Sequence, residues 1–456
     1  MRRSPRFIVA GFACFALLLA ACSETIDEAT PPSGSDSTAP PAGDDETSPS
    51  EPDEDSSATP DEEETSPAPE RTSDPVPLEL LSDLPGQILL LDPDEQVIVS
   101  EPDGSSEVVL SEAGTSNSQP TWSRGGDRVA WSGFGPDGST LTTARSDGSG
   151  SQSIAVISPA FYLSWSPDDN WIGGLRPTNT GMEMFVASPE DSTDRQVSMS
   201  QPFYFDWVDD DAIVAYINNQ LLVDISASGV TNPLRRPLAN PLGAFQAPAV
   251  LPNGEVLGAL FIDGSNRLVR LNGTEIVEEI ATASGPILIA ASPDGTRVAT
   301  LVPPFAGGQQ EPQSDVISFQ FDEPVELENG RVTIIDLETG EVEVQPEEQV
   351  VSMSWSPDSE SLALLAVDGD GLQWSFNTPE GQRVGEQFVP SPRFSQQYLP
   401  FFDQYNLSTT AWSPDGEAVV FSGTIGNESG VFIDRVSDDL GAAHLAEGDI
   451  AFWSPN

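Results

Sequence analysis

The chain has 456 residues and a formal net charge of −55, because 73 acidic residues face 18 basic ones, all of which are Arg. Such an acidic surface repels nucleic acid and anionic lipid headgroups, so the composition argues against both as partners. A single His and two Cys exclude zinc sites built from these side chains.

The N-terminus has the composition of an export signal. Three arginines within the first six residues precede an apolar run, Phe7 to Leu19, that is too short to span a bilayer comfortably. The tetrapeptide LAAC at 19–22 resembles a bacterial lipobox, in which a signal peptidase cuts just before the cysteine. The resemblance implies that residues 1–21 are removed and that Cys22 carries a lipid. The alternative is an ordinary secretory signal.

Residues 22–76 are predicted to form a disordered tether. The stretch consists almost entirely of Pro, Ser, Thr, Asp and Glu, with 17 acidic residues and one Arg after Cys22. It cannot bury enough apolar surface to offset chain entropy, and like charges keep it extended. Since Cys14 lies in the signal, the mature chain has no cysteine pair, and residues 77–456 must depend on a large core.

A hairpin motif recurs through residues 77–456. The copy AWSPDGEAVVFSG, residues 411–423, has near copies that begin at residues 121, 290 and 354. Aligned on the Trp position, the series is Trp122, Trp165, Trp207, Val250, Ala291, Trp355, Trp412 and Trp453. Five of the seven gaps are 41–43 residues, which is the period of a four-stranded propeller blade, roughly 40–45 residues. The spacing predicts an all-β propeller.

The motif has the residues of a tight hairpin turn. Ser413, Pro414 and Gly416 suit a type I turn followed by a left-handed residue, and apolar residues flank the turn on both sides. The Trp is large and flat, so we expect it to pack between neighbouring blades.

The two ends of the folded region are predicted to complete one blade. The chain stops at IAFWSPN, an inner strand, and the region begins with GQILLLD, EQVIVSEPDG and SSEVVLS, which are three outer strands. Pairing them closes the ring and removes exposed sheet edges. The Trp-position residues indicate eight blades. Seven is the alternative, because Val250 and Ala291 replace the Trp and the hairpin after Trp207 lacks Pro and Gly.

The repeats SWSPD, AASPDG, SWSPDS and AWSPDG resemble those of TolB-like propellers, a branch of the WD-repeat-like superfamily, over about residues 85–456. Relatives in that superfamily include periplasmic protein-binding subunits, envelope lipoproteins and the gating propellers of prolyl peptidases. The chain departs from the last group because no hydrolase domain follows the repeats. It departs from TolB because a tether replaces the globular N-terminal domain.

Residues with catalytic or metal-binding chemistry are few. His444 is the only His, is predicted to lie in or beside an outer strand, and has no G-x-S-x-G motif to accompany it. The run at 208–211 (VDDD), and the pair Asp368 and Asp370, could bind Ca²⁺ but lack EF-hand spacing. We interpret them as solvated turn acids and predict no metal and no cofactor. A Ca²⁺-dependent binding module is an alternative.

Two long gaps in the repeat series mark insertions. The extra residues are Pro303–Asn329, between the second and third strands of one blade, and Pro390–Thr409, between two blades. In a four-stranded antiparallel blade both kinds of loop emerge on the same face. Long loops on a rigid scaffold are where function concentrates.

The second insertion and two shorter loops of that face are rich in aromatic residues. Aromatic residues and Arg form the centres of interfaces. The candidate binding residues are Arg393, Phe394, Tyr398, Phe401, Phe402 and Tyr405 in the insertion, and Phe161, Tyr162, Phe203 and Tyr204 in the shorter loops. The alternative for the insertion is a small core that caps the propeller mouth. The alternative for the shorter loops, which precede inner strands, is packing between blades.

The sequence therefore predicts a lipid-anchored, extracytoplasmic propeller without catalysis of its own. It would present the insertion face to an unknown protein or peptide of the envelope or the exterior, and would meet the membrane through its lipid alone. The alternative is a glycan-acting enzyme with paired carboxylates in the central channel, at least one of them with a perturbed pKa.

Overall fold

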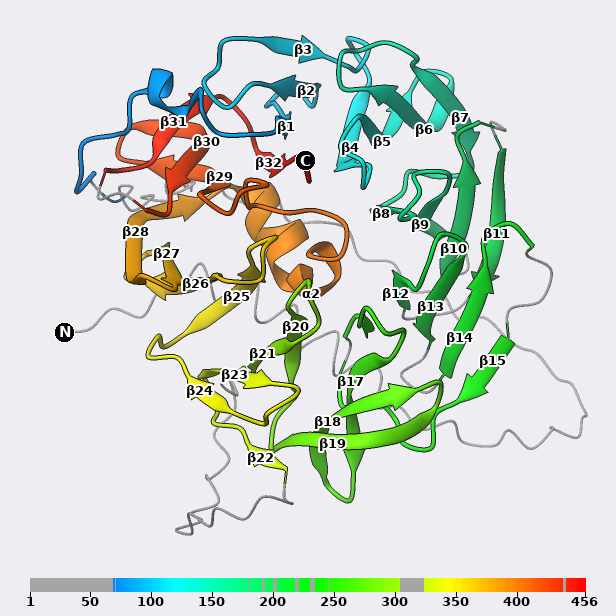
Figure 1. Cartoon of the computed structure of the whole chain (residues 1–456). Coiled ribbons are helices and arrows are strands. Elements are labelled where there is room, and N and C mark those ends of the chain that lie inside the picture. Colours follow the sequence, from blue (N-terminus) through cyan, green and yellow to red (C-terminus); the bar gives the residue numbers. More distant parts are fainter. Residues whose placement is uncertain are drawn as a thin grey trace, which may run out of the picture.

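The computed structural model describes Pro69 and residues 71–456, apart from 180, 191–192, 200–202, 218–220, 230–233, 245, 304–323 and 438–439. The predicted signal, Cys22 and most of the predicted tether lie outside the described residues. Within the described part of the chain, no helix is long and apolar enough to cross a membrane. The strands form a ring of antiparallel blades around a central axis (Figure 1).

The first four blades follow the chain from its N-terminal side. Blade 1 consists of β1 (Ile88–Leu91), β2 (Val97–Ser100), β3 (Glu107–Val109) and the C-terminal β32 (Ile450–Trp453). Blade 2 consists of β4 (Ser116–Trp122), β5 (Arg128–Gly135), β6 (Gly138–Arg145) and β7 (Gln152–Val156). Blade 3 consists of β8 (Tyr162–Trp165), β9 (Ile172–Thr178), β10 (Gly181–Ser188) and β11 (Thr193–Met199). Blade 4 consists of β12 (Phe203–Trp207), β13 (Ala212–Ile217), β14 (Leu221–Ser226) and β15 (Leu234–Pro237).

The remaining blades complete the ring. Blade 5 consists of β16 (Ala249–Val250), β17 (Val256–Ile262), β18 (Ser265–Asn272) and β19 (Glu275–Ala283). Blade 6 consists of β20 (Leu288–Ala291), β21 (Arg297–Leu301), β23 (Val332–Asp336) and β24 (Val342–Val344). Blade 7 consists of β25 (Val350–Trp355), β26 (Leu362–Asp368), β27 (Gly371–Thr378) and β28 (Gly381–Pro390). Blade 8 consists of β29 (Ala418–Ile425), β30 (Glu428–Arg435) and β31 (Ala443–Ala446), and a bridge from Trp412 to Val419 supplies its inner position.

The ring closes as the sequence predicts. β32 pairs with β1 in antiparallel register, from Ile88 opposite Trp453 to Leu91 opposite Ile450. The all-β propeller with a closing C-terminal strand is therefore confirmed, and the described strands make the eight blades that the Trp positions indicate. Blades 7 and 8 also join directly, because the end of β28 pairs with β29.

Four of the repeated Trp residues hydrogen-bond to the preceding blade. Seven inner strands, β4, β8, β12, β16, β20, β25 and β32, end at the Trp-position residue. Four indole N–H groups then donate to the backbone carbonyl just before that position in the preceding blade: Trp122 to Phe452 at 3.4 Å, Trp207 to Ser164 at 3.2 Å, Trp355 to Ala290 at 3.0 Å and Trp412 to Ser354 at 3.2 Å. Packing of the Trp between blades is confirmed.

A buried serine organises the repeated turn. In blade 8, Ser413 Oγ donates to Asp415 Oδ1 at 2.6 Å and accepts from the Ala418 N–H at 2.9 Å. Gly416 takes the left-handed position with φ +73°. Where the motif lacks this Gly, Asp169 and Ser359 adopt φ +60° and +66°. The hydrogen bonds of the turn therefore hold a conformation that the side chain alone would disfavour.

Both insertions lie between the strands that the repeat predicts. The first lies between β21 and β23. Residues 304–323 of it lie outside the described part, and its end forms β22 (Val325–Glu326), which pairs in parallel with β19 of blade 5. The second follows β28 and forms short helices, η2 (Phe394–Tyr398), η3 (Leu399–Phe401) and α2 (Phe402–Tyr405). A further short helix, η1 (Leu78–Leu81), precedes β1.

Candidate functional site

The second insertion, residues 390–409, occupies the centre of the ring, where its helices lie inside the circle of inner strands (Figure 1). The Gln404 side chain pairs with the Phe205 backbone of blade 4, accepting from its N–H at 3.0 Å and donating to its carbonyl at 2.9 Å. Asn406 Nδ2 donates to the Met353 carbonyl of blade 7 at 2.8 Å. The insertion is therefore held from opposite parts of the ring.

Two tyrosines tie the insertion to blades 2 and 3. The Tyr405 hydroxyl lies 3.0 Å from Gln119 Oε1 and donates to the Phe161 carbonyl at 2.8 Å. The Tyr162 hydroxyl donates to the Gln404 carbonyl at 3.1 Å. Burial raises the pKa of Tyr162 to about 12, so this hydroxyl stays protonated and able to donate.

The aromatic residues of the insertion face inward. Tyr398, Phe402 and Tyr405 are 3%, 6% and 9% exposed, and Phe394 and Phe401 are partly buried against the core cluster that contains Tyr398 and Tyr405. The Tyr398 and Tyr405 ring centroids lie 4.3 Å apart. This packing favours a cap on the propeller mouth over a surface that meets a partner.

Arg393 is the charged member of the predicted set. Its side chain is 15% exposed and its guanidinium pairs with Glu95 of the loop between β1 and β2 at 2.9 Å. The ion pair fixes the start of the insertion to blade 1, so this Arg is engaged within the molecule.

The predicted residues of the shorter loops divide between core and surface. Tyr162 is buried, with its ring 5.2 Å from Phe205 of blade 4 and 5.5 Å from Tyr405. Phe161 is 36% exposed. Tyr204 is partly buried on β12, whereas the side chain of Phe203 lies outside the described part. Tyr162 therefore packs between blades, while Phe161 faces solvent.

Two carboxylates lie at the centre beside blade 5. Asp206 of β12 accepts from the Trp207 N–H at 2.8 Å and the Val250 N–H at 3.3 Å. Asp403 of the insertion accepts from the Ala247 N–H at 2.9 Å. Burial raises the pKa of each carboxyl to about 6. Both acids support the inner segment of a blade that has Val in place of the Trp.

The other predicted acids and the His lie in ordinary structural positions. Asp209 Oδ1 accepts from the N–H groups of Asp211 and Ala212 at 2.9 and 2.7 Å, so it organises its own turn. Asp368 ends β26 at the turn into β27. His444 lies on the outer strand β31, as predicted, and its Nε2 is 3.0 Å from the Ser429 carbonyl.

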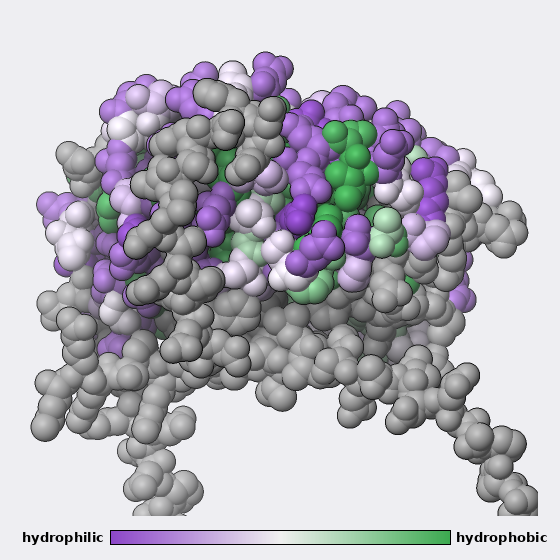
Figure 2. Space-filling model, turned by 90° about the horizontal axis from the view of Figure 1, so that it is seen from below, coloured by the Kyte–Doolittle hydropathy of each residue, from purple (hydrophilic) through white to green (hydrophobic). Residues whose placement is uncertain are grey.

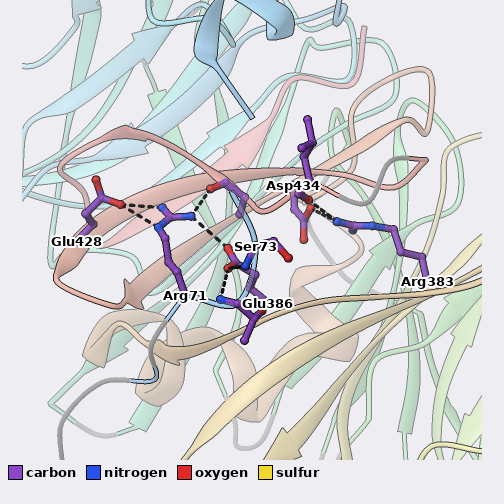
Figure 3. Close-up of polar contacts among 9 residues, drawn as sticks. Arg71, Ser73, Arg383, Glu386, Glu428 and Asp434 are labelled. Carbon is purple, nitrogen blue, oxygen red and sulfur yellow. Dashed lines mark hydrogen bonds and ion pairs between the residues drawn. The ribbon is translucent and has the colours of Figure 1, made fainter. Parts of the chain in front are cut away.

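A polar cluster at blade 8 is not predicted by any sequence motif (Figure 3). Arg71 donates to Glu386 Oε2 at 3.1 Å and to Glu428 Oε2 at 2.7 Å. Glu386 Oε1 accepts from the N–H groups of Thr72 and Ser73 at 3.0 and 3.2 Å. We call Arg71, Thr72, Ser73, Glu386 and Glu428 the N-terminal clasp. Residues 71–76, which the sequence assigns to the tether, thus contact the propeller.

The clasp continues into the outer strands of blades 7 and 8. Arg383 of β28 pairs with the buried Asp434 of β30 at 2.8 Å, as Figure 3 shows. The Val76 N–H and the Asp74 carbonyl bond to Gly441 at 2.9 and 2.8 Å. The segment that leads to the tether is therefore fixed to blade 8.

An acidic groove of about 450 Å³ lies between blades 7 and 8 on the face opposite the insertion. The charged residues that line it are Asp358, Glu360, Glu380, Arg383, Asp415 and Glu417. Figure 2 shows another side of the ring, where the described surface is mainly hydrophilic with one hydrophobic patch. Five of the six charged residues in the groove are acids, so this part of the surface keeps the acidic character of the composition.

Comparison with known proteins identifies the fold. No family model matches the chain, and no curated protein sequence matches it. Dihydro-heme d1 dehydrogenase NirN, solved with DHE, is 13% identical with a TM-score of 0.53, over 87% of this chain and 79% of that one. TolB from Acinetobacter baumannii is 14% identical with a TM-score of 0.35, over 68% and 67%. The WD40 domain of Sif2 is 14% identical with a TM-score of 0.44, over 65% and 84%. The likeness is distant and shows a β-propeller alone.

Proposed function

We propose that this protein is a lipid-anchored, extracytoplasmic propeller that binds a protein or peptide of the cell envelope and has no catalysis of its own. The observation that supports this best is the filled centre of the ring. The insertion donates hydrogen bonds to backbone carbonyls on or beside the inner strands of blades 3, 4 and 7, from the side chains of Tyr405, Gln404 and Asn406. A substrate that bound in the central channel of the ring would need the space that this insertion occupies.

The outer surface is then the part available to a partner. Its strong negative charge favours a basic partner and speeds encounter with one at low salt. Two regions are open to test: the acidic groove between blades 7 and 8, and the insertion face around the exposed Phe161.

The test is affinity capture from the native envelope with three forms of the full chain. One is unmodified, one carries Glu360→Gln and Glu417→Gln in the groove, and one carries Phe161→Ala. We expect one variant to lose a partner that the unmodified chain and the other variant retain. Deletion of the insertion is unsuitable, because Tyr398, Phe402 and Tyr405 belong to the core. Equal retention of the same background by all three forms would contradict the proposal.

The anchoring has its own test. Cys22→Ser removes the thiol that the lipobox resemblance assigns to lipid. We expect the variant to leave the membrane fraction and to lose a lipid mass from its N-terminal peptide. A variant that stays in the membrane fraction with an unchanged N-terminal mass would contradict anchoring through Cys22.

Glycan hydrolysis is a second candidate function, favoured by the raised pKa values of Asp206 and Asp403 at the ring centre. Their backbone N–H partners favour a structural role instead. A glycan screen with the unmodified chain, Asp206→Asn and Asp403→Asn distinguishes hydrolysis from a structural role. Glycan turnover by the unmodified chain that is lost in both variants would establish the enzyme.

A further inference from the structure

A cavity of about 60 Å³ lies under the insertion, beside blades 7, 8 and 1. It lies where the inner segment of blade 8 has two isolated bridges, Trp412 to Val419 of its own blade and Thr410 to Trp453 of blade 1, in place of the regular inner strand of the other blades. Thr409 and Ala411 of this segment line the cavity. The chain leaves α2 at Tyr405, a few residues before this point, and forms no regular strand at the inner position of blade 8.

Three polar side chains of the cavity wall lack a protein hydrogen-bond partner among the described residues. They are the Trp374 Nε1–H of β27, the Tyr398 hydroxyl of η2 and the Ser422 hydroxyl of β29. These residues are 4%, 3% and 1% exposed. Each comes from a different part of the molecule: blade 7, the insertion and blade 8.

Unpaired polar groups are uncommon in folded cores, because each loses its hydrogen bonds to water on burial. Three on one cavity wall indicate that something else satisfies them. The other lining residues are mostly aromatic or aliphatic, and none of the lining residues carries a charge. A charged guest would lose its hydration without a counter-ion, so the chemistry favours an uncharged one.

The volume limits the guest to a few atoms. A buried water needs about 10–15 Å³ of such space, whereas a cavity that holds benzene measures about 150 Å³. A volume of about 60 Å³ therefore admits a few waters or one solute of comparable size.

We propose that this cavity is a binding site for a small uncharged guest that accepts a hydrogen bond from Trp374 and exchanges hydrogen bonds with Tyr398 and Ser422. The guest is a cluster of a few waters or one oxygen-bearing solute of that size. It joins the insertion to blades 7 and 8, and so helps to hold the insertion in the centre of the ring.

The sign of a stability change tests the site. Tyr398→Phe and Ser422→Ala each remove one hydroxyl from the full chain. If a guest binds there, each variant loses a guest hydrogen bond and its Tm falls by about 1–3 °C. If the cavity is dry, each variant loses an unpaired polar group and its Tm rises.

Tyr216→Phe is the matched control. The Tyr216 hydroxyl is also buried without a protein partner among the described residues, but it lies in blade 4 away from this cavity. We expect its removal to leave the Tm unchanged or raise it. A rise in Tm for both Tyr398→Phe and Ser422→Ala would overturn the proposal.

A second measurement identifies the guest. Oxygen-17 magnetic relaxation counts long-lived internal waters in the unmodified chain and in the double variant. A lower count in the variant identifies water. A small neutral compound released on unfolding, found by mass spectrometry and missing from the variant, identifies a solute. Xenon binding in the cavity, with neither of these signals, would show a dry site and overturn the proposal.

Discussion

At the scale of single residues, the repeated Trp combines two interactions that can be separated. Trp355 and Trp165 both stack against an Arg that begins the second strand of the preceding blade, at 4.6 Å for Arg297 of β21 and 5.1 Å for Arg128 of β5. The Trp355 indole N–H also donates to the Ala290 carbonyl of the preceding blade, whereas the Trp165 N–H is buried without a partner among the described residues. A comparison of Trp355 with Trp165 therefore isolates the contribution of the hydrogen bond between blades.

We expect Trp355→Phe to lower the free energy of unfolding by about 1 kcal/mol more than Trp165→Phe, because both lose ring volume but one also loses a hydrogen bond. Urea unfolding of both variants measures the difference. Equal losses would mean that packing alone explains the recurrence of Trp.

The buried Asp206 makes a pH-dependent contribution. Its pKa of about 6 in the folded protein is above the ordinary value of 3.8, because burial disfavours the charged form. The folded state therefore binds the proton more tightly, and this stabilisation, present below pH 4, is lost as the pH rises through 6.

We expect Asp206 to lower the free energy of unfolding of the unmodified chain by about 1–3 kcal/mol between pH 4 and pH 7. In Asp206→Asn this contribution should be absent. Urea titrations at these two pH values measure it, with the exposed Asp137→Asn as the control for loss of one charge. A decline of the same size in both variants would rule out this role for Asp206.

At the scale of elements, the N-terminal clasp determines where the chain enters the propeller. Glu386 is 5% exposed, and three N–H donors from Arg71, Thr72 and Ser73 converge on its carboxylate. Removal of one partner from such a buried pair leaves the other uncompensated. The Arg71 end of the segment should then loosen before the propeller unfolds, whereas the backbone bonds of Asp74 and Val76 to Gly441 still hold the other end.

We expect Arg71→Ala to weaken attachment of residues 71–76 by about 2–4 kcal/mol. Hydrogen exchange of these residues should accelerate while exchange in β28 and β30 stays slow. Arg145→Ala is the control, since its pair with Asp127 is 61% and 60% exposed and contributes little. Unchanged exchange in residues 71–76 would show that the backbone bonds to Gly441 suffice.

Local chemistry explains which elements the sequence predicts well. Ser413 and Gly416 encode their turn through short-range hydrogen bonds and a left-handed φ, and the Trp period reports the blade. The clasp escaped prediction because Arg71 and Glu386 are 315 residues apart and neither belongs to a motif. For Tyr398 and Tyr405, composition alone does not distinguish an aromatic interface from an aromatic cap, since both bury the same rings.

At the scale of the whole molecule, the ring depends on its last strand. β32 covers β1 through four paired residues, Trp453 donates to the Pro85 carbonyl at 2.8 Å, and Trp122 of blade 2 donates back to Phe452. The same strand contacts the insertion, because the Phe452 ring lies 5.2 Å from Tyr398. Closure of the ring and filling of its centre are thus coupled through one short segment.

We expect a chain that ends at Gly448 to lose cooperative unfolding and to associate, because removal of β32 exposes the edge of β1 and the core behind it. Size exclusion and thermal unfolding measure both effects. A chain that lacks only Asn456 is the control, since it keeps β32 whole. If the shorter chain stays monomeric with an unchanged Tm, the remaining blades hold the ring without closure, and the coupling to Tyr398 would be incidental.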